Sequence, residues 1–140
     1  MEDNSDPDAS SQFRQRKILV VDDNVDGADS LAMLLEFMDY QVRTAYDGLQ
    51  AVKLAENWQP DLVILDINMP VMNGYQAARQ LRSMKQTPRV VLVALTAQTS
   101  LLDRASAKAA GFDVHLSKPV ESERLAEVVD RSLHHRNTPV

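Results

Sequence analysis

Five polar side chains in this sequence lie at or near the ends of short apolar runs. They are Asp22, Asp23, Asp66, Thr96 and Lys118. Short runs rich in branched apolar residues are typical of strands that are buried on both faces of a parallel sheet. The carboxyl ends of parallel strands lie along one edge of the sheet, which is where open α/β folds bind their ligands. A single Asp after a strand more often only begins a turn, but the five together predict a site at this edge.

The three aspartates predict a site for a hard cation. Carboxylates that lie close together repel one another at neutral pH, so they need either raised pKa values or a bound cation. Oxygen ligands without His or Cys suit Mg²⁺, which binds one or two carboxylates, keeps several waters and accepts an oxygen of a phosphoryl group. The backbone carbonyl of Asn68 is expected within reach of the same ion. We therefore expect Mg²⁺ to bind at Asp22, Asp23, Asp66 and Asn68.

Asp66, Thr96 and Lys118 have the chemistry that transfer of a phosphoryl group to a carboxylate requires. Asp66 is the candidate nucleophile. Lys118 and the metal would neutralise charge on the phosphoryl oxygens, and Thr96 would donate a hydrogen bond to one of them. The product is an acyl phosphate, which brings about two negative charges to the site. Such a change can pull Thr96 and Lys118 inward and so shift a bistable surface.

The composition favours a single soluble domain. A chain of 140 residues is long enough for one domain and too short for two of ordinary size. Its net charge of -5 argues against broad binding to nucleic acid or to an anionic membrane. The sequence has no Cys, no apolar stretch of the roughly 20 residues that a membrane span needs, and no signal-peptide pattern at its start. These features predict a cytoplasmic protein.

Five strand patterns alternate with five helical patterns, which predicts an α/β fold. We expect strands at residues 17–21, 41–45, 62–65, 89–95 and 112–116, and helices at residues 26–38, 49–58, 73–84, 99–109 and 121–134. Such alternation calls for a parallel sheet that is covered on both faces by right-handed crossovers. Residues 1–16 carry little apolar surface and are predicted to be a disordered tail, and residues 136–140 are predicted to be a second, short tail.

Four motifs, in this order, make the chain resemble the receiver domains of two-component response regulators. They are Val-Val-Asp-Asp, Leu-Asp-Ile-Asn-Met-Pro-Val-Met-Asn-Gly, Ala-Leu-Thr-Ala and Ser-Lys-Pro. The chain is similar to single-domain chemotaxis regulators and to the receiver domains of hybrid histidine kinases, with a domain at residues 17–135. The resemblance implies a doubly wound, flavodoxin-like sheet of five parallel strands in the order 2-1-3-4-5. The alternation of elements alone does not give that order.

The resemblance also implies a role for each residue of the site. Asp66 would accept a phosphoryl group from a phosphohistidine on a histidine kinase or a histidine phosphotransfer protein. Asp23, Asp66 and the carbonyl of Asn68 would bind Mg²⁺ directly, and Asp22 would bind it mainly through a water. Thr96 and Lys118 would contact the phosphoryl oxygens. The peptide bond between Lys118 and Pro119 is often cis in the family.

Three further positions bear on how long the phosphate lasts and how it is read. Asn68 and Gln98 occupy positions that flank the phosphoryl group in the family and tune the loss of phosphate. Three residues before the lysine the family often has Tyr or Phe, which turns inward with the threonine, and this chain has His115 instead. His115 is either a switch residue whose charge depends on pH or an ordinary surface histidine.

Three functions are compatible with such a site. The first is a phosphorylation-activated switch that catalyses only its own phosphorylation and dephosphorylation. The second is a receiver-like scaffold that binds partners without phosphotransfer, which loss of an acid, the Thr or the Lys would favour, and none is lost. The third is a phosphatase, which usually has a second Asp two residues after the nucleophile, where this chain has Asn68.

The output of the switch is expected to pass through protein contacts. We expect no DNA-binding output domain within this chain, and by resemblance residues 99–134 form the surface that a downstream protein binds. We expect a monomer or a weak homodimer that binds neither nucleic acid nor membrane. Whether the chain is a whole protein or a part of a hybrid sensor kinase stays open.

Overall fold

The computed structural model describes residues 15–69, 72–84, 90–96 and 104–137. Five strands form one parallel sheet in the order β2-β1-β3-β4-β5. Their bounds are β1 (Lys17–Val21), β2 (Gln41–Ala45), β3 (Leu62–Asp66), β4 (Val91–Thr96) and β5 (Val114–Ser117). The helices between and after them are α2 (Val25–Phe37), α3 (Gly48–Trp58), α4 (Gly74–Ser83), α5 (Arg104–Ala110) and α6 (Ser122–Asn137). The predicted α/β class, the doubly wound sheet and the strand order are confirmed.

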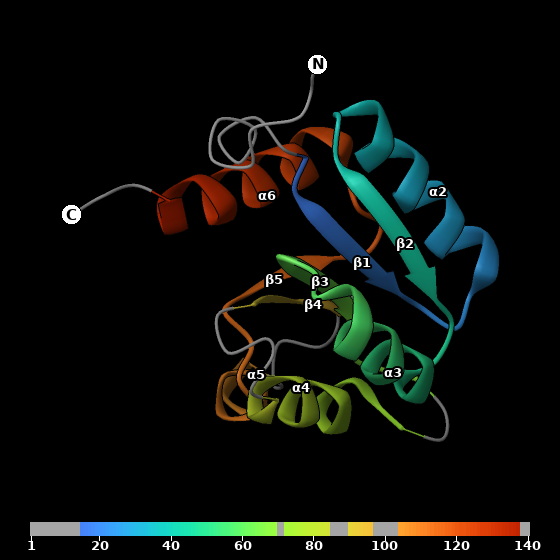
Figure 1. Ribbon diagram of the computed structural model, residues 1–140, viewed down its shortest axis with the longest axis vertical. Helices are drawn as coiled ribbons and strands as arrows, with labels where there is room; N and C mark the ends of the chain where they lie inside the picture. The colour runs from blue at the N-terminus through green and yellow to red at the C-terminus, as the bar shows by residue number, and fades with distance from the viewer. Residues whose placement is uncertain (1–14, 70–71, 85–89, 97–103, 138–140) are drawn as a thin grey trace, which may run out of the picture.

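The helices cover both faces of the sheet, so the three central strands are buried on both sides (Figure 1). One apolar cluster joins one face of the sheet to α2 and α6, for example through Ile64, Leu35 and Leu125. The other cluster joins the opposite face to α3, α4 and α5 through residues such as Leu65 and Leu81. Because side chains alternate along a strand, one apolar run supplies both clusters. This rigid sheet fixes where each strand ends, and therefore where the polar side chains that follow it lie.

Side-chain caps set the starts of three helices, each of which differs from its predicted start by one residue. The Asn24 side chain accepts the N–H of Gly27, so α2 begins at Val25. Asp47 caps α3 by accepting the N–H of Gln50 at 2.8 Å. Asn73 and Gln76 form a reciprocal capping box at the start of α4. Polar caps of this kind satisfy N–H groups that have no partner inside the helix.

The described part of the chain extends slightly into both predicted tails. Gln15 donates from Nε2 to the carbonyl of Asp39 at 3.1 Å, and the carbonyl of Arg16 accepts the N–H of Gln41. Helix α6 continues through Asn137, which lies within the predicted second tail. Residues 1–14 and 138–140, on which the rest of the two tail predictions falls, lie outside the described ranges. The predicted helix at 99–109 is found as α5 from Arg104, and residues 99–103 lie outside the described part.

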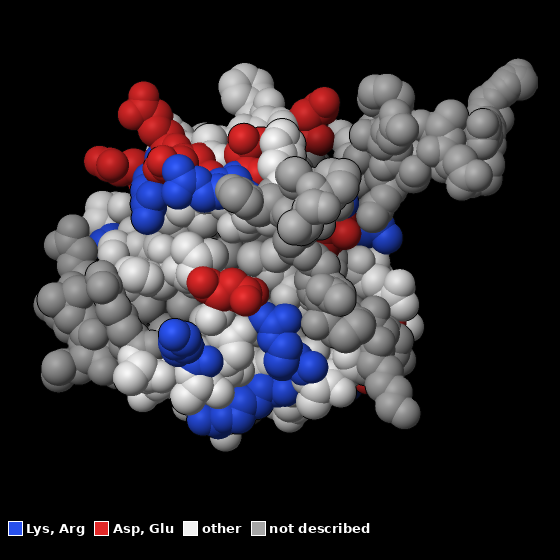
Figure 2. Space-filling view, turned by 90° about the vertical axis from the view of Figure 1, so that its left-hand side faces the viewer, with Lys and Arg blue, Asp and Glu red and all other residues white. Residues whose placement is uncertain are grey.

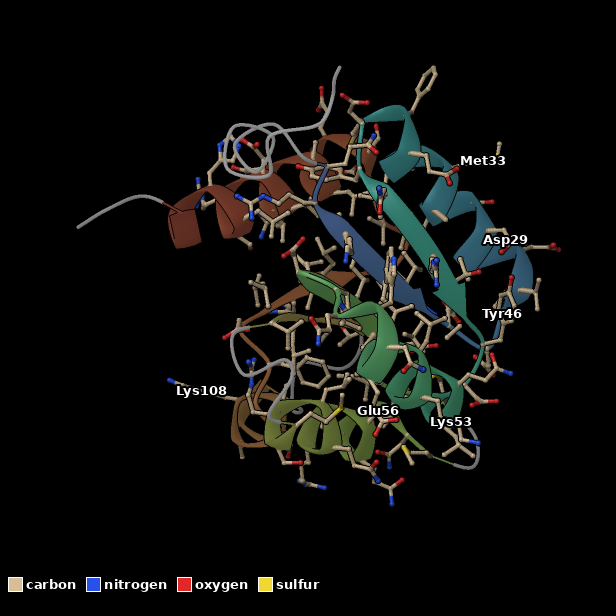
Figure 3. All side chains as sticks on the ribbon, viewed as in Figure 1. Asp29, Met33, Tyr46, Lys53, Glu56 and Lys108 are labelled. Carbon is tan, nitrogen blue, oxygen red and sulfur yellow. The ribbon has the colours of Figure 1, made fainter. Side chains whose placement is uncertain are left out.

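Two smaller contacts complete the frame around the sheet. Trp58 is half-buried against the cluster of α3 and α4, and the guanidinium of Arg43 lies 4.9 Å from the centre of its ring. The hydroxyl of Tyr46 donates to Asp29 Oδ1 at 2.8 Å, which joins the segment after β2 to α2 (Figure 3). Among the described helices, none is both long enough and apolar enough to cross a membrane.

Candidate functional site

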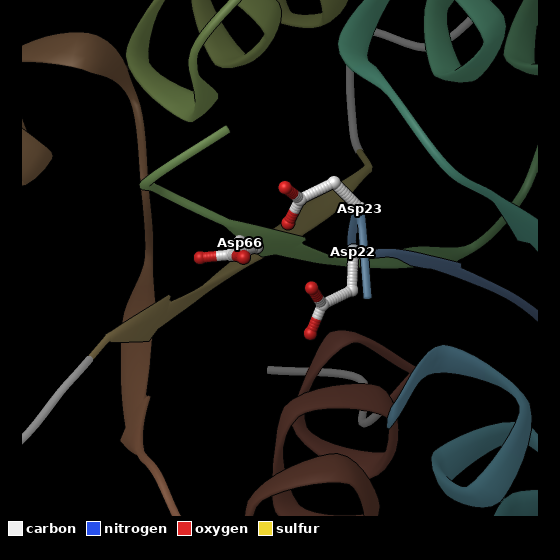
Figure 4. A group of neighbouring side chains, drawn as sticks. All are labelled: Asp22, Asp23 and Asp66. Atoms are coloured by element: carbon white, nitrogen blue, oxygen red, sulfur yellow. The ribbon is translucent and has the colours of Figure 1, made fainter. Parts of the chain in front are cut away.

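Three carboxylates meet at the carboxyl edge of the sheet. Asp22 and Asp23 follow β1, and Asp66 is the last residue of β3, directly beside it in the sheet. One carboxylate oxygen from each lies within 4.8 Å of those of the other two. Asp22 and Asp66 are buried, whereas Asp23 is exposed. In Figure 4 the carboxylate of Asp22 points toward the side of α2 and α6, and that of Asp23 points to the opposite side.

Lys118 brings one positive charge to this cluster. Its Nζ lies 3.3 Å from Asp66 Oδ2 and 3.3 Å from Asp22 Oδ2. The backbone holds it there, because the N–H of Lys118 donates to the carbonyl of Thr96 at 2.7 Å and its bond to Pro119 is cis, as the resemblance implies. One ammonium therefore faces two buried carboxylates, and the third carboxylate stands beside them.

Each of the two buried carboxylates is held by a local turn of the same kind. The N–H of Asn24 donates to Asp22 Oδ1 at 3.0 Å, and the N–H of Asn68 donates to Asp66 Oδ1 at 3.0 Å. In each case the aspartate binds the backbone two residues ahead, an arrangement that Asp favours in turns. Oδ1 of both groups is thus fixed by backbone, and Oδ2 of both groups faces Lys118.

Burial raises the pKa of Asp66 from 3.8 to about 6. The N–H of Asn68 and the charge of Lys118 lower this pKa, while the neighbouring Asp22 raises it. Burial also acts on Lys118 and lowers its pKa, but Asp66 and Asp22 outweigh that effect, so the net shift is upward. Lys118 is therefore charged at neutral pH, and Asp66 loses its proton less readily than an ordinary aspartate.

Thr96 lies on β4, the strand beside Asp66, and His115 lies on β5, one strand further out. Thr96 ends β4 and is buried, and its hydroxyl donates to the carbonyl of Leu116 at 3.5 Å, on β5 rather than toward Asp66. His115 lies on β5, is half-buried and pairs in register with Ala94. Gln98, the third residue expected near the site, lies outside the described residues. Thr96 is thus close to the site with its hydroxyl held by the neighbouring strand.

Gly74 positions the segment that carries Asp66, a role that the sequence did not reveal. Its N–H donates to the carbonyl of Ile67 at 2.9 Å. A Cβ at this position would lie 2.5 Å from the carbonyl oxygen of Asp66 and 2.6 Å from the Cα of Ile67. Any side chain would therefore push against the backbone that ends β3. The Asn73-Gly74 pair was the available signal, but it indicated only the start of a helix.

The residues present fit a hard divalent cation. The donors are carboxylate oxygens from three residues, two of which are buried. Among the described residues one ammonium, that of Lys118, faces them, so negative charge is in excess when all three acids are ionised. A divalent cation would offset that excess, and oxygen donors are those that Mg²⁺ prefers. Asp22, Asp23 and Asp66 are the residues that could hold it. The part of the Asn68 carbonyl in binding the ion stays a prediction.

Comparisons with known proteins place this geometry in a family. A family model described as the response regulator receiver domain matches residues 18–130. The response regulator MprA of Mycobacterium sp. (strain KMS) is 39% identical over 123 residues, which cover 88% of this chain and 52% of that protein. The chain therefore spans about half the length of this relative. Protein PilH of Pseudomonas aeruginosa is 35% identical over 117 residues, which cover 84% of this chain and 97% of PilH.

A solved structure agrees with these matches. The receiver domain of the sensor histidine kinase PA1611 from Pseudomonas aeruginosa superposes with a TM-score of 0.79 at 32% sequence identity. The superposition covers 86% of this chain and 99% of that domain, and that structure has a magnesium ion coordinated in its active site cleft.

Proposed function

The chain belongs to the family of response regulator receiver domains, and we propose that it is a switch activated by phosphorylation of Asp66. The observation that carries this proposal is the state of Asp66, which is 3% exposed, carries a raised pKa and lies 3.3 Å from Lys118. The fold itself does not require a buried carboxylate beside a cation and two further acids. This environment suits a nucleophile that meets a phosphoryl group and a metal.

The chain's own residues would carry most of the transfer. Asp66 Oδ2, which faces Lys118, would attack phosphorus, while Oδ1 accepts the N–H of Asn68. Bound Mg²⁺ would supply positive charge to the phosphoryl oxygens. Lys118 would leave Asp22 and contact the same oxygens, and Thr96 would exchange the carbonyl of Leu116 for one of them. The new charges would thus draw β4 and the end of β5 toward the phosphate.

Phosphate uptake measured by intact mass tests this function. The protein is incubated with a small phosphodonor with and without Mg²⁺, beside Asp66→Asn as the matched variant. We expect a gain of one phosphoryl group only in the wild type and only with Mg²⁺. No adduct after rapid quenching would instead favour the scaffold function, in which the same fold binds partners without phosphotransfer.

The phosphodonor would be a histidine kinase or a histidine phosphotransfer protein, and the protein is proposed to act in the cytoplasm. It would catalyse only its own phosphorylation and the loss of that phosphate, and Asn68 and Gln98 would tune the rate of that loss.

A downstream protein would bind the surface formed by residues 99–134. On the face that contains α6, β5 and α5, acidic and basic side chains both gather over α6, and mainly basic ones lie at the opposite end (Figure 2). Such a patterned surface suits a specific protein partner.

His115 would report phosphorylation to that surface. It lies on β5 beside Leu116, whose carbonyl holds the Thr96 hydroxyl, so a shift of Thr96 reaches it through one residue. Phosphorylated His115→Ala should bind a phosphorylation-dependent partner at least several-fold differently from the wild type. Equal affinity of the two phosphorylated proteins would discard this role.

A further inference from the structure

An apolar groove of about 600 Å³ lies beside the phosphoryl site. Its apolar walls come from Leu31 and Leu34 of α2, Leu95 of β4 and Val120 after β5. Asp22 and Lys118, which are also part of the acidic site, line the groove as well. A molecule that places a phosphoryl group against Lys118 can therefore extend an apolar part into the groove without leaving the protein surface.

The groove lies next to the proposed nucleophile, because Lys118 both lines the groove and contacts Asp66. The Nζ of Lys118, a residue that lines the groove, lies 3.3 Å from Asp66 Oδ2. The carboxylate of Asp22 points to the side of α2 and α6, where the groove lies, and Asp23 points away from it (Figure 4). A short aliphatic chain attached to the phosphoryl group would extend along the groove toward the apolar walls.

Gly27 keeps the groove open, and no constraint among the described residues explains why it is a glycine. Glycine is a poor helix former, yet Gly27 is the third residue of α2. Its φ is not positive, and an added Cβ would have its nearest neighbours in the Asn24 side chain at 3.5 Å, an ordinary contact. Because Gly27 lines the groove, a larger side chain there would occupy the groove itself. The lack of a side chain at Gly27 therefore leaves room in the groove for a ligand.

We propose that this groove is a subsite for a short aliphatic chain carried by a small phosphodonor, such as an aliphatic acyl phosphate. The proposal rests on the proposed function of Asp66. In the reaction an Asp66 carboxylate oxygen forms the bond to phosphorus, the bond from phosphorus to the acyl oxygen breaks, and the fatty carboxylate leaves with the electron pair. No further reactant is needed. The aliphatic chain would be held against Leu31, Leu34 and Val120 while its phosphoryl group meets Lys118.

Binding of alkylphosphonates tests the groove without phosphotransfer, because a phosphonate cannot donate its phosphorus. We would titrate methylphosphonate and butylphosphonate with Mg²⁺ and follow the methyl signals of leucine and valine by NMR. Full burial of the three extra methylenes should tighten binding about 60-fold, and partial burial proportionally less. Gly27→Leu should abolish this difference and leave methylphosphonate binding unchanged. Asn57→Leu, which adds the same side chain on the exposed surface of α3, should keep the difference.

Equal affinity for the two phosphonates, or binding of neither, would overturn the subsite. Rates of phosphate uptake from acetyl phosphate and butyryl phosphate then separate the two claims. If no acyl phosphate modifies the protein but the longer phosphonate still binds more tightly, the function proposed for Asp66 fails and the subsite stands. If both acyl phosphates modify it at the same rate and the phosphonates bind equally, the switch stands and the subsite fails.

Discussion

The aspartates at the two edges of the sheet differ in how well their charges are matched by hydrogen-bond and ion-pair partners. At the amino edge, Asp61 Oδ2 accepts the N–H of Lys17 at 2.8 Å, and Asp113 Oδ2 accepts both the N–H of Leu92 at 2.8 Å and Arg82 at 2.9 Å. At the carboxyl edge, Asp66 and Asp22 share one ammonium, and burial raises the pKa of Asp66 to about 6. Carboxylates at the first edge hold the strands together, whereas those at the second are left in excess of their partners. Such an excess suits a site that gains a cation and a phosphoryl group.

Arg82 is the strongest test of the amino edge. Its guanidinium donates to the carbonyls of Val90 and Gly111 and to Asp113, so it joins α4 to the starts of β4 and β5. Arg82→Met leaves all three acceptors without this donor and should lower the free energy of unfolding by about 3 kcal/mol. Urea denaturation measures the change. Arg79→Met, at an exposed position one turn away, should change it by less than about 0.5 kcal/mol. An equal loss of unfolding free energy in the two variants would show that the three hydrogen-bonded contacts of Arg82 do not stabilise the fold.

Asp66→Asn should have the opposite sign and stabilise the metal-free protein. Because the folded pKa of Asp66 lies above its unfolded value, its ionisation costs stability, which falls as the pH rises from about 4 to about 6 and stays low above that. At about pH 7.5 the amide should raise the free energy of unfolding by about 2 kcal/mol, and near pH 4 it should change little. Denaturation at the two pH values measures this. Asp113→Asn should instead destabilise at about pH 7.5, because it removes a carboxylate that Arg82 and Leu92 bind.

If Asp66→Asn instead lowered the free energy of unfolding at neutral pH, the two edges would not differ in the way proposed. That result would mean that the charge of Asp66 contributes to the fold as that of Asp113 does.

Mg²⁺ should stabilise the protein in a pH-dependent way. A metal that binds only the folded state raises its stability, and at saturating Mg²⁺ the gain at about pH 7.5 should be about 1–2 kcal/mol. Below the folded pKa of about 6, Asp66 must release its proton before it can bind the ion, so the gain should shrink toward pH 5. Thermal unfolding with and without Mg²⁺ measures it, with Ca²⁺ and Asp66→Asn as controls. A gain that is the same at both pH values would argue against Asp66 as a ligand.

The convergence of the site was predictable because it depends on topology. Once Leu62–Asp66 is a central parallel strand, Asp66 must lie beside Asp22, and the strand after it brings Thr96 to the same edge. The order of the strands came from the family resemblance, since alternation of strands and helices leaves that order open. Lys118 follows the last strand and was placed by the same reasoning.

What the sequence could not predict depends on contacts between distant segments. The clamp of Arg82 needs the turn at Gly111, 29 residues away, and no local pattern announces it. The close approach of Gly74 to Asp66 and the bond from Thr96 to Leu116 are likewise products of packing. The groove beside Lys118 has walls from three separate segments, and its opening at Gly27 gains meaning only when they are assembled.

The most direct test asks which of the three carboxylates takes the phosphoryl group. The protein would be treated with a small phosphodonor and Mg²⁺, and the acyl phosphate would be reduced with borohydride, which converts a phosphorylated aspartate to homoserine. Peptide mapping by mass spectrometry then reads each position separately. We expect homoserine at position 66 alone, and none without Mg²⁺ or without the donor. Homoserine at position 22 or 23, or reduction that occurs equally without Mg²⁺, would contradict the assignment of Asp66 as the phosphoacceptor of a metal-dependent switch.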